Sequence, residues 1–360
     1  MMKRYSLIIL LFLLITTSAF AQDTRFSQYT STPLLINPAL TGMGNGYSRA
    51  NLNYRSQWTT TNSSFNTAAI SVDFPIYAEN MNWKNGYLST GLSFFNDNAG
   101  SGIIKNNEAN LALGAAFFSG RHAKFSLGIL GGYTQKSISV ESIQWDSQYN
   151  GFAYDPSLSS QENFVSLSSG SGDVSAGISY RYNNSRIGLT SDGHGNNVLF
   201  ETGFAAYHLL EPKFNVLGNA TSKTSRRYVG HARFLKSVAS PFVIGGSVLY
   251  MQQEVYTEIT IGFEMRYVLN GNTKYTGFIK DSYLAVQILY RNQDAIIPVL
   301  SYKFNNWKIS TSYDYNLSKL NSVTGGNGGF EISIQFNDFE GELFNQGNKY
   351  TNYRGSAGNF

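Results

Sequence analysis

The sequence contains no cysteine and few charged residues. Without cysteine the chain has no acylated thiol, no disulfide and no thiolate ligand for a metal. Charged residues make up 14% of the 360-residue chain, whereas a soluble domain usually has about a quarter. The formal net charge is only +4, too small for the electrostatic footprint of a nucleic-acid-binding protein. These deficits exclude a lipoprotein and argue against an ordinary soluble domain.

Catalytic and metal-binding motifs are also missing. The four histidines are His122, His194, His208 and His231, and no two are spaced to share one face of a helix. There is no H-E-x-x-H motif and no G-x-S-x-G elbow between a strand and a helix. The glycine-rich stretches 96–102 and 325–329 are interpreted as strand connections rather than ligand loops. We therefore expect no catalytic site, no metal and no cofactor.

Long apolar runs are absent apart from a short one at the N-terminus. Lys3 and Arg4 precede an apolar run at 7–15 and the small-residue triplet at 19–21. This order is typical of a secretory signal peptide, which predicts that residues 1–21 are removed before Gln22. The run is too short to span a bilayer as a helix, which needs about twenty residues. Processing leaves 25 basic against 23 acidic side chains.

Glycine and aromatic residues are abundant instead. Aromatic residues make up 15% of the chain, glycines number 35, and the mean hydropathy is -0.21. A transmembrane β-barrel alternates lipid-facing apolar residues with lumen-facing polar residues, which averages to such an intermediate hydropathy. The composition therefore favours that class over a helical membrane protein.

Two-residue alternation supports a barrel most clearly at 258–267. Ile259, Ile261 and Phe263 alternate there with Glu258 and Thr260, which gives a strand one apolar and one polar face. Counting such runs predicts about fourteen strands: 47–58, 64–76, 86–96, 103–118, 123–137, 172–183, 198–210, 226–236, 241–252, 255–269, 281–292, 294–304, 307–316 and 328–336. The predicted fold class is all-β, a transmembrane antiparallel β-barrel over residues 47–336.

An even strand number lets the barrel close with both chain ends on the periplasmic side of a bacterial outer membrane. The polar connections 138–171, 211–225 and 317–327 then face the cell surface. Alternation alone also fits a soluble β-sandwich or propeller, so that alternative stays open. Glu258, Glu264 and Arg266 lie on one face of a predicted strand. They indicate either a selective pore or a lumenal network in which opposite charges pair with one another, and we favour the network.

The mature N-terminus carries a longer motif. Residues 22–29 read Gln-Asp-Thr-Arg-Phe-Ser-Gln-Tyr, and residues 33–42 include Ile-Asn-Pro-Ala. This resembles the opening of the PorP/SprF family of type IX secretion system outer-membrane proteins, with departures at Thr24, Arg25 and Thr32. The matching residues in this segment are Phe26, Ser27, Gln28, Tyr29, Pro33, Asn37 and Pro38. Matching residues in the predicted barrel are Tyr54, Arg55, Gln57, Trp58, Asn96, Asp97, Asp294, Pro298, Tyr313 and Asp314.

The resemblance implies a role in protein secretion, cell-surface adhesin anchoring or gliding motility. Family members accompany large secreted proteins that have type B C-terminal sorting domains, and one is associated with periplasmic components of the machine. The implied partners are therefore the C-terminal domain of a surface protein or adhesin, periplasmic type IX components and outer-membrane lipid.

Two segments flank the predicted barrel. Residues 22–46 contain Pro33 and Pro38, which are poor interior strand residues because they lack an amide donor. This segment is expected either to plug the lumen or to lie as a periplasmic strap against the turns. The tail 337–360 has little periodicity, and it is expected to be a disordered periplasmic extension or a handle for a partner.

The leading functional hypothesis is a non-enzymatic barrel that docks the C-terminal domain of a secreted protein. Its predicted contact is the surface loop 138–171, because aromatic residues dominate interface energetics. The candidate contact residues are Trp145, Tyr149, Phe152, Tyr154 and Phe164. The alternative is an outer-membrane channel for hydrophobic or small polar solutes, resembling fatty-acid transporters. An outer-membrane phospholipase ranks third, because the Ser/His/Asn arrangement is missing.

Overall fold

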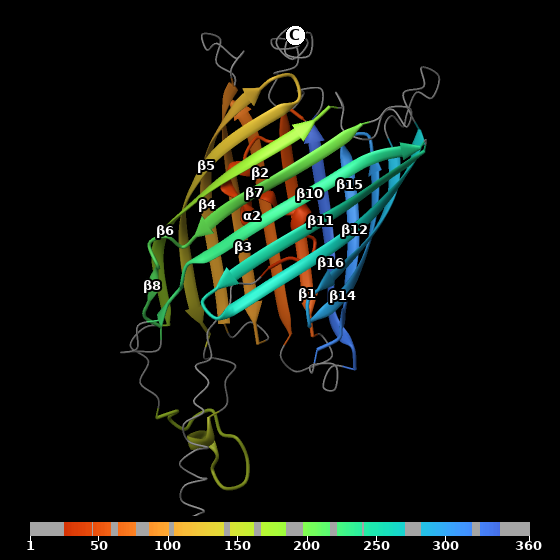
Figure 1. The fold of residues 1–360 in the computed structure, drawn as a ribbon. Helices are drawn as coiled ribbons and strands as arrows, with labels where there is room; N and C mark the ends of the chain where they lie inside the picture. The colour runs from red at the N-terminus through yellow and green to blue at the C-terminus, as the bar shows by residue number, and fades with distance from the viewer. Residues whose placement is uncertain are drawn as a thin grey trace, which may run out of the picture.

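The chain forms a closed β-barrel in the computed structural model (Figure 1). The structure describes residues 25–44, 46–58, 64–76, 86–100, 104–139, 145–161, 167–184, 197–216, 222–239, 241–270, 282–318 and 325–338. Fourteen strands pair in sequence order, each antiparallel to its neighbours, and β1 closes the barrel against β16. The predicted signal peptide, most of the predicted C-terminal tail and Phe164 lie outside the described residues.

The barrel strands correspond closely to the predicted runs. They are β1 (Ser48–Gln57), β2 (Phe65–Ile76), β3 (Gly86–Ala99), β4 (Ile104–Ser119), β5 (Ala123–Ile138), β6 (Ser168–Asn183), β7 (Val198–Tyr207), β10 (Arg227–Ala239), β11 (Phe242–Gln253), β12 (Tyr256–Asn270), β13 (Ser282–Arg291), β14 (Ala295–Phe304), β15 (Trp307–Asn316) and β16 (Asn327–Asp338). The prediction of a fourteen-stranded antiparallel barrel is confirmed.

A few strand ends differ from the prediction, each for a local reason. β6 begins at Ser168 because its Ser- and Gly-rich start pairs by backbone hydrogen bonds with the end of β5, where no apolar alternation marks it. β7 ends at Tyr207 because His208 has a positive φ of 58°, which extended strands do not use. A two-stranded hairpin, β8 (Lys213–Phe214) with β9 (Ser222–Lys223), lies within the predicted loop 211–225.

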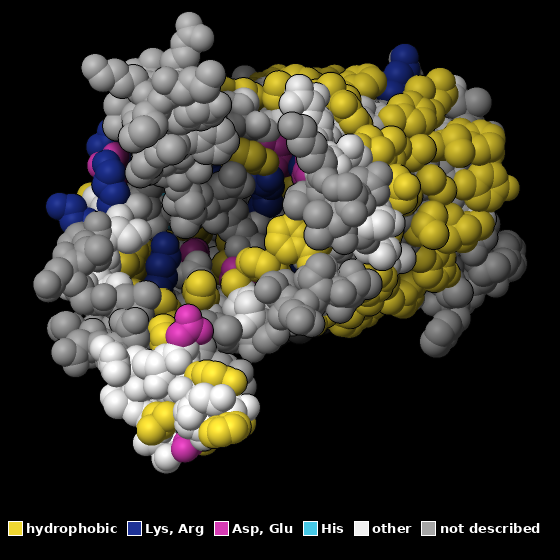
Figure 2. Space-filling view, turned by 90° about the horizontal axis from the view of Figure 1, so that it is seen from below, with side chains coloured by type: hydrophobic (Ala, Val, Ile, Leu, Met, Phe, Trp, Pro, Cys, Tyr) yellow, Lys and Arg dark blue, Asp and Glu magenta, His cyan; other side chains and the backbone are white. Residues whose placement is uncertain are grey.

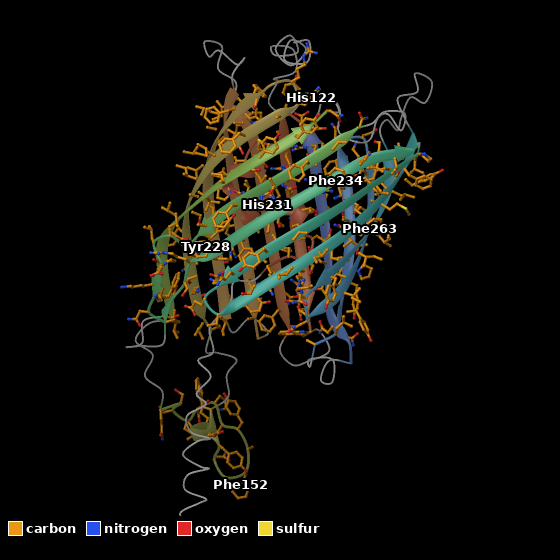
Figure 3. All side chains as sticks on the ribbon, viewed as in Figure 1. His122, Phe152, Tyr228, His231, Phe234 and Phe263 are labelled. Carbon is orange, nitrogen blue, oxygen red and sulfur yellow. The ribbon has the colours of Figure 1, made fainter. Side chains whose placement is uncertain are left out.

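Alternation along each strand places apolar side chains on the outside of the barrel. In β12, Ile259, Ile261 and Phe263 point outward, and Phe263 is 57% exposed. Phe234 and Phe263 project from the outer face in Figure 3, and a broad hydrophobic surface covers the wall in Figure 2. A bilayer solvates this surface, since backbone groups are fully paired within a closed barrel. The soluble sandwich or propeller alternative is therefore wrong.

The two ends of the barrel differ. At the terminal end, β1 starts at Ser48 opposite Asp338, the last residue of β16. At the opposite end, the loop end, residues 139–167 connect β5 to β6 and include the 3₁₀ turn η3 (Asp146–Gln148). The described part of this loop extends away from the barrel in Figure 1. Among the described residues no helix combines the length and the apolar character needed to cross a membrane.

Residues 25–44, the lumenal segment, run through the interior of the barrel. They form η1 (Tyr29–Ser31), α2 (Pro33–Ile36) and η2 (Pro38–Leu40). Pro33 and Pro38 stand at the first position of α2 and η2, where a missing amide donor costs nothing. Nearly every side chain of the segment is buried against inward-facing residues of the wall. The contacts correspond to the plug, the first of the two arrangements expected from the sequence.

Candidate functional site: the occupied lumen

The lumenal segment is held near the loop end by buried carboxylates. Glu331 of β16 accepts hydrogen bonds from the backbone N–H groups of Ser27 at 2.7 Å and Gln28 at 2.9 Å. Asp314 of β15 accepts from the Ser27 hydroxyl at 2.8 Å. Hydrogen bonds to charged groups contribute about 1.5–3 kcal/mol each. Two acidic residues of adjacent strands therefore anchor the start of the segment.

Arginines complete this cluster. Arg55 of β1 pairs with Asp314 at 2.7 Å, and Arg291 of β13 approaches the same carboxylate at 3.3 Å and the Ser27 hydroxyl at 2.6 Å. Arg25, at the start of the described segment, pairs with Glu258 of β12. These residues form the anchor cluster, which joins the segment to β1, β12, β13, β15 and β16: Arg25, Ser27, Gln28, Arg55, Glu258, Arg291, Asp314 and Glu331.

Asn37 holds the middle of the segment. Its Oδ1 accepts from the backbone N–H of Ala39 at 2.9 Å and so caps η2. Its Nδ2 donates to the backbone carbonyl of Ile178 at 2.9 Å and lies 3.1 Å from Nε2 of His231. One amide side chain therefore shapes the segment and attaches it to two strands of the wall.

The terminal end of the segment is attached by further polar contacts. Asp73 of β2 accepts from the backbone N–H of Gly42 at 2.7 Å and pairs with Arg49 of β1 at 2.9 Å. Arg49 also donates to the carbonyl of Leu40 at 2.9 Å. The segment thus crosses the lumen from Arg25 near the loop end to Gly44 near the terminal end.

The charge series seen in the sequence pairs within the lumen. Glu264 accepts from Arg266 of the same strand at 2.6 Å and from Arg233 of β10 at 2.8 Å. Glu258 faces Arg25 and, at 3.7 Å, Arg291. Each carboxylate of the series thus has a basic partner, as the charge network favoured above predicts, but Arg233 and Arg266 share the single carboxylate of Glu264. The partners come from the same strand (Arg266), from the neighbouring strand β13 (Arg291), from β10 two strands away (Arg233) and from the segment (Arg25). Cross-strand pairing of neighbours therefore explains only part of the network.

The residues of the family motif fall into two groups. Those of the lumenal segment, with Arg55, Asp97 and Asp314, face the interior. Asp294 pairs with Arg291 at 2.9 Å in the turn between β13 and β14. Gln57 ends β1 and faces Gly329 of β16. The remaining motif residues face outward or stand at strand ends: Tyr54, Trp58, Asn96, Pro298 and Tyr313.

Other interior residues were not singled out from the sequence as site residues. Glu331 and Arg291 are ordinary members of alternating strands, and the family motif includes Asn37 but not its partner His231. Only the alternation itself marks Glu331 and Arg291 as inward-facing. The partners they meet are more than a hundred residues away in the sequence, so no local pattern reveals them.

The candidate contact residues of the surface loop lie at the loop end. Tyr149 and Tyr154 pair through an isolated bridge, and Phe152 lies between them with 95% of its surface exposed. Figure 3 shows Phe152 at the tip of the loop, far from the barrel wall. The backbone N–H of Phe152 donates to Asn150 at 3.0 Å, so the tip has a defined turn. Trp145 precedes η3 at the base of the described loop.

These features define the class of protein. A closed antiparallel barrel with an apolar outer surface and a polar lumen is an outer-membrane-type β-barrel protein. The family model described as "Type IX secretion system membrane protein PorP/SprF" matches residues 18–336. The chain therefore belongs to the PorP/SprF family of type IX secretion system membrane proteins.

Solved structures offer similarities in barrel form. The translocator domain of the autotransporter NalP from Neisseria meningitidis has 11% identity and a TM-score of 0.40, over 81% of this chain and 88% of that chain. The Pseudomonas putida toluene transporter TodX has 8% identity and a TM-score of 0.43, over 84% and 93%. A search of the curated proteins found no match. Similarities this low say nothing about what this chain binds.

Proposed function

We propose that this chain is a non-enzymatic outer-membrane barrel of the type IX secretion machinery. It helps to secrete, or anchors at the cell surface, a large protein with a type B C-terminal sorting domain, including adhesins used in gliding. Family membership supports the secretion role. The exposed aromatic tip at Phe152 supports a protein contact at the loop end, since buried aromatic anchors dominate interface energetics.

The occupied lumen supports a docking role over a channel role. The lumenal segment contacts wall strands on all sides and leaves separate cavities toward its two ends of about 180 Å³ and 50 Å³. A solute channel would require this segment to leave the lumen. The motif residues of the segment, from Phe26 to Pro38, accordingly serve to hold the plug rather than to contact cargo.

Phe152→Ser is the sharpest test of the contact. The Phe152 side chain is almost fully exposed. The hydrogen bond from its backbone N–H to Asn150 does not involve the side chain, so the substitution leaves the turn intact. The large surface protein that co-purifies with the wild-type barrel is first identified from native membranes. In the variant, that protein is expected to co-purify poorly and to appear in the medium.

Val255→Ser is the matched control. Val255 is also an exposed apolar side chain, in the turn between β11 and β12 at the same end of the barrel. It is expected to leave both co-purification and surface retention unchanged. Equal surface retention in the Phe152 variant and the wild type would remove the loop from the proposed contact.

A further inference from the structure

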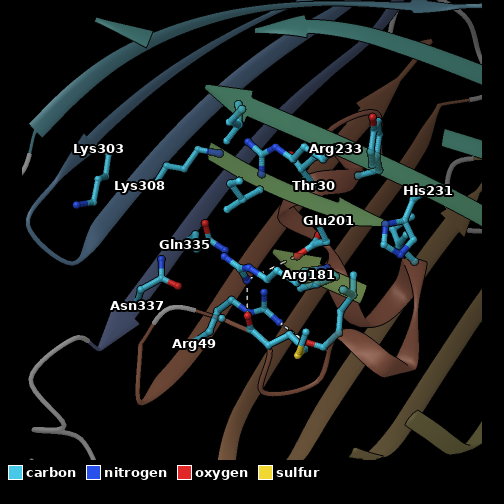
Figure 4. Close-up of a pocket in the computed structure, with 18 of the residues that line it drawn as sticks. Thr30, Arg49, Arg181, Glu201, His231, Arg233, Lys303, Lys308, Gln335 and Asn337 are labelled. Atoms are coloured by element: carbon cyan, nitrogen blue, oxygen red, sulfur yellow. Dashed lines mark hydrogen bonds and ion pairs between the residues drawn. The ribbon is translucent and has the colours of Figure 1, made fainter. Parts of the chain in front are cut away.

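A cavity lies inside the terminal end of the barrel, on the other side of the lumenal segment from the surface loop. Its volume is about 180 Å³. Tyr29, Pro33 and Leu40 of the segment line it together with inward-facing side chains of the wall. Figure 4 labels Thr30 of the segment among these wall residues. Asn337 and Lys303, close to the ends of β16 and β14, place it next to the mouth at this end.

The wall of this cavity is strongly basic. Six strands each contribute one basic side chain, and the acidic residue that lines it is Glu201 of β7. The six bases are Arg49, Arg181, Arg233, Arg266, Lys303 and Lys308. Figure 4 labels all of them except Arg266. Six strands of the barrel therefore place positive charge around one small cavity.

Among the described residues, the nearby carboxylates do not balance this charge. Arg49 pairs with Asp73 at 2.9 Å, and Arg181 lies 3.6 Å from Glu201. Arg233 and Arg266 share Glu264, at 2.8 Å and 2.6 Å.

Lys308 lines the same cavity as both arginines and lies within electrostatic range of Glu264. Three bases around Glu264 therefore face one negative charge. If Lys303 and the Arg181–Glu201 pair are left out, four bases remain, which are Arg49, Arg233, Arg266 and Lys308. They face two carboxylates, those of Asp73 and Glu264.

Such an arrangement is costly without an anion. Like charges held together in a lumen of reduced dielectric repel each other and lose hydration. The Nε of Arg233 also has no hydrogen-bond partner within the part of the chain that the structure describes. An anion among Arg233, Arg266 and Lys308 would supply both the missing charge and an acceptor.

We infer that this cavity binds a compact, multiply charged oxyanion of the phosphate type. Arginine forks and a lysine ammonium are well suited to several oxygens on one centre. The volume suits a phosphate or pyrophosphate group, whereas the lumenal segment blocks the depth that a peptide would need. A free phosphate and the phosphate of a lipid headgroup share this chemistry. The site lies at the opposite end from the proposed cargo contact, so the two proposals stand or fall separately.

Calorimetric titration of the purified barrel with inorganic pyrophosphate, in a zwitterionic detergent, tests the site. Binding is expected to weaken with added salt. Lys308→Gln and Arg233→Gln are each expected to weaken binding by about tenfold to a hundredfold, since a charge-assisted hydrogen bond contributes about 1.5–3 kcal/mol. Lys308→Arg is expected to retain binding.

Lys223→Gln, at an exposed lysine of β9 near the loop end, is the matched control and is expected to bind like the wild type. Heat-modifiable gel mobility checks that each variant is a folded barrel. If Arg233→Gln does not fold, the comparison of Lys308→Gln with Lys308→Arg still decides the question. Absence of pyrophosphate binding, or equal binding by Lys308→Gln and the wild type, would overturn the site.

Two further titrations identify the source of the anion. Nanodiscs that contain phosphatidic acid are compared with nanodiscs of phosphatidylcholine alone. Weaker apparent pyrophosphate binding in the first identifies a lipid headgroup as the natural ligand, and equal binding identifies a free anion. Tighter binding of a poly-glutamate peptide than of pyrophosphate would contradict the assignment to a compact oxyanion.

Discussion

Gly128 of β5 lies directly against Ala39 of the lumenal segment. A Cβ placed on Gly128 would lie less than 3.0 Å from the backbone N of Ala39 and from the carbonyl of Pro38. Real Cβ atoms essentially never make contacts this short. Ser126, two residues earlier on the same face, donates to the carbonyl of Ala39 at 2.6 Å. The wall is thus shaped to accept the backbone of η2, and neither backbone can shift cheaply.

Gly128→Ala should therefore weaken the attachment of the segment. Inserting a methyl group into a filled site costs about 1–3 kcal/mol, so the midpoint of thermal unfolding in detergent is expected to fall. Gly131→Ala is the control on the same strand, because nothing lies within 4 Å of a Cβ built there. Identical midpoints for the two variants would mean that η2 does not occupy this position.

Asp314→Asn should destabilise the barrel more strongly. Asp314 pairs with the buried Arg55 at 2.7 Å and with Arg291 at 3.3 Å, and its loss leaves buried positive charge uncompensated. Breaking such a pair costs about 3–5 kcal/mol, which unfolding in urea can measure. Tyr313→Phe, one residue earlier and facing outward, is expected to cost far less. A loss no larger than that of Tyr313→Phe would rule out a stabilising role for the anchor cluster.

Deletion of residues 25–44 should open the lumen. The wild-type barrel is expected to show little conductance in planar bilayers, because its segment separates the two cavities. A barrel of this size is wide enough to pass small ions once it is emptied, so the deletion variant is expected to give resolvable single-channel steps. Solute-dependent conductance of the intact wild type would instead support the channel alternative.

Asp155 in the surface loop offers a pH-dependent test. The Ser157 hydroxyl donates to its carboxylate at 2.6 Å and the Ser157 backbone N–H at 3.0 Å, which together lower the pKa of Asp155. A lowered carboxyl pKa stabilises the turn at neutral pH, and this contribution is lost as the pH falls through that pKa.

Ser157→Ala should raise the pKa of Asp155 toward its usual range, as followed by NMR titration of the carboxyl carbon. Ser159→Ala removes a neighbouring hydroxyl that accepts from Gln161 and makes no hydrogen bond to Asp155. It is expected to leave the titration unchanged. An unaltered titration in Ser157→Ala would show that this hydroxyl does not hold the turn.

The sequence predicts the wall far better than it predicts the interior. Alternation at Ile259, Ile261 and Phe263 identifies both the strand and its outward face, because a bilayer imposes that pattern locally. Alternation also shows that Glu264 faces inward. It cannot show that Arg233, two strands away, is the partner of Glu264, since that distance depends on the closure of the whole barrel.

The lumenal segment shows the same limit. Pro33 and Pro38 indicate that the segment is not a strand, which left the plug and the strap as alternatives. The choice depends on surface fit, as where Gly128 makes room for Ala39, and on partners such as Glu331 for Ser27. Single-position patterns carry no information about such complementary surfaces. For the same reason the sequence does not predict the basic cavity, because each of its bases is one inward-facing residue of a different strand.

The seam between β1 and β16 has a consequence for biogenesis. Asn53 and Arg55 of β1 donate to carbonyls of the lumenal segment, while Glu331 of β16 accepts from it. The first and last strands of the barrel are therefore bridged by the lumenal segment as well as by their own backbone pairing. We expect the segment to assist closure of the barrel, so a chain that lacks it is expected to insert more slowly and to leave more incompletely closed assembly intermediates.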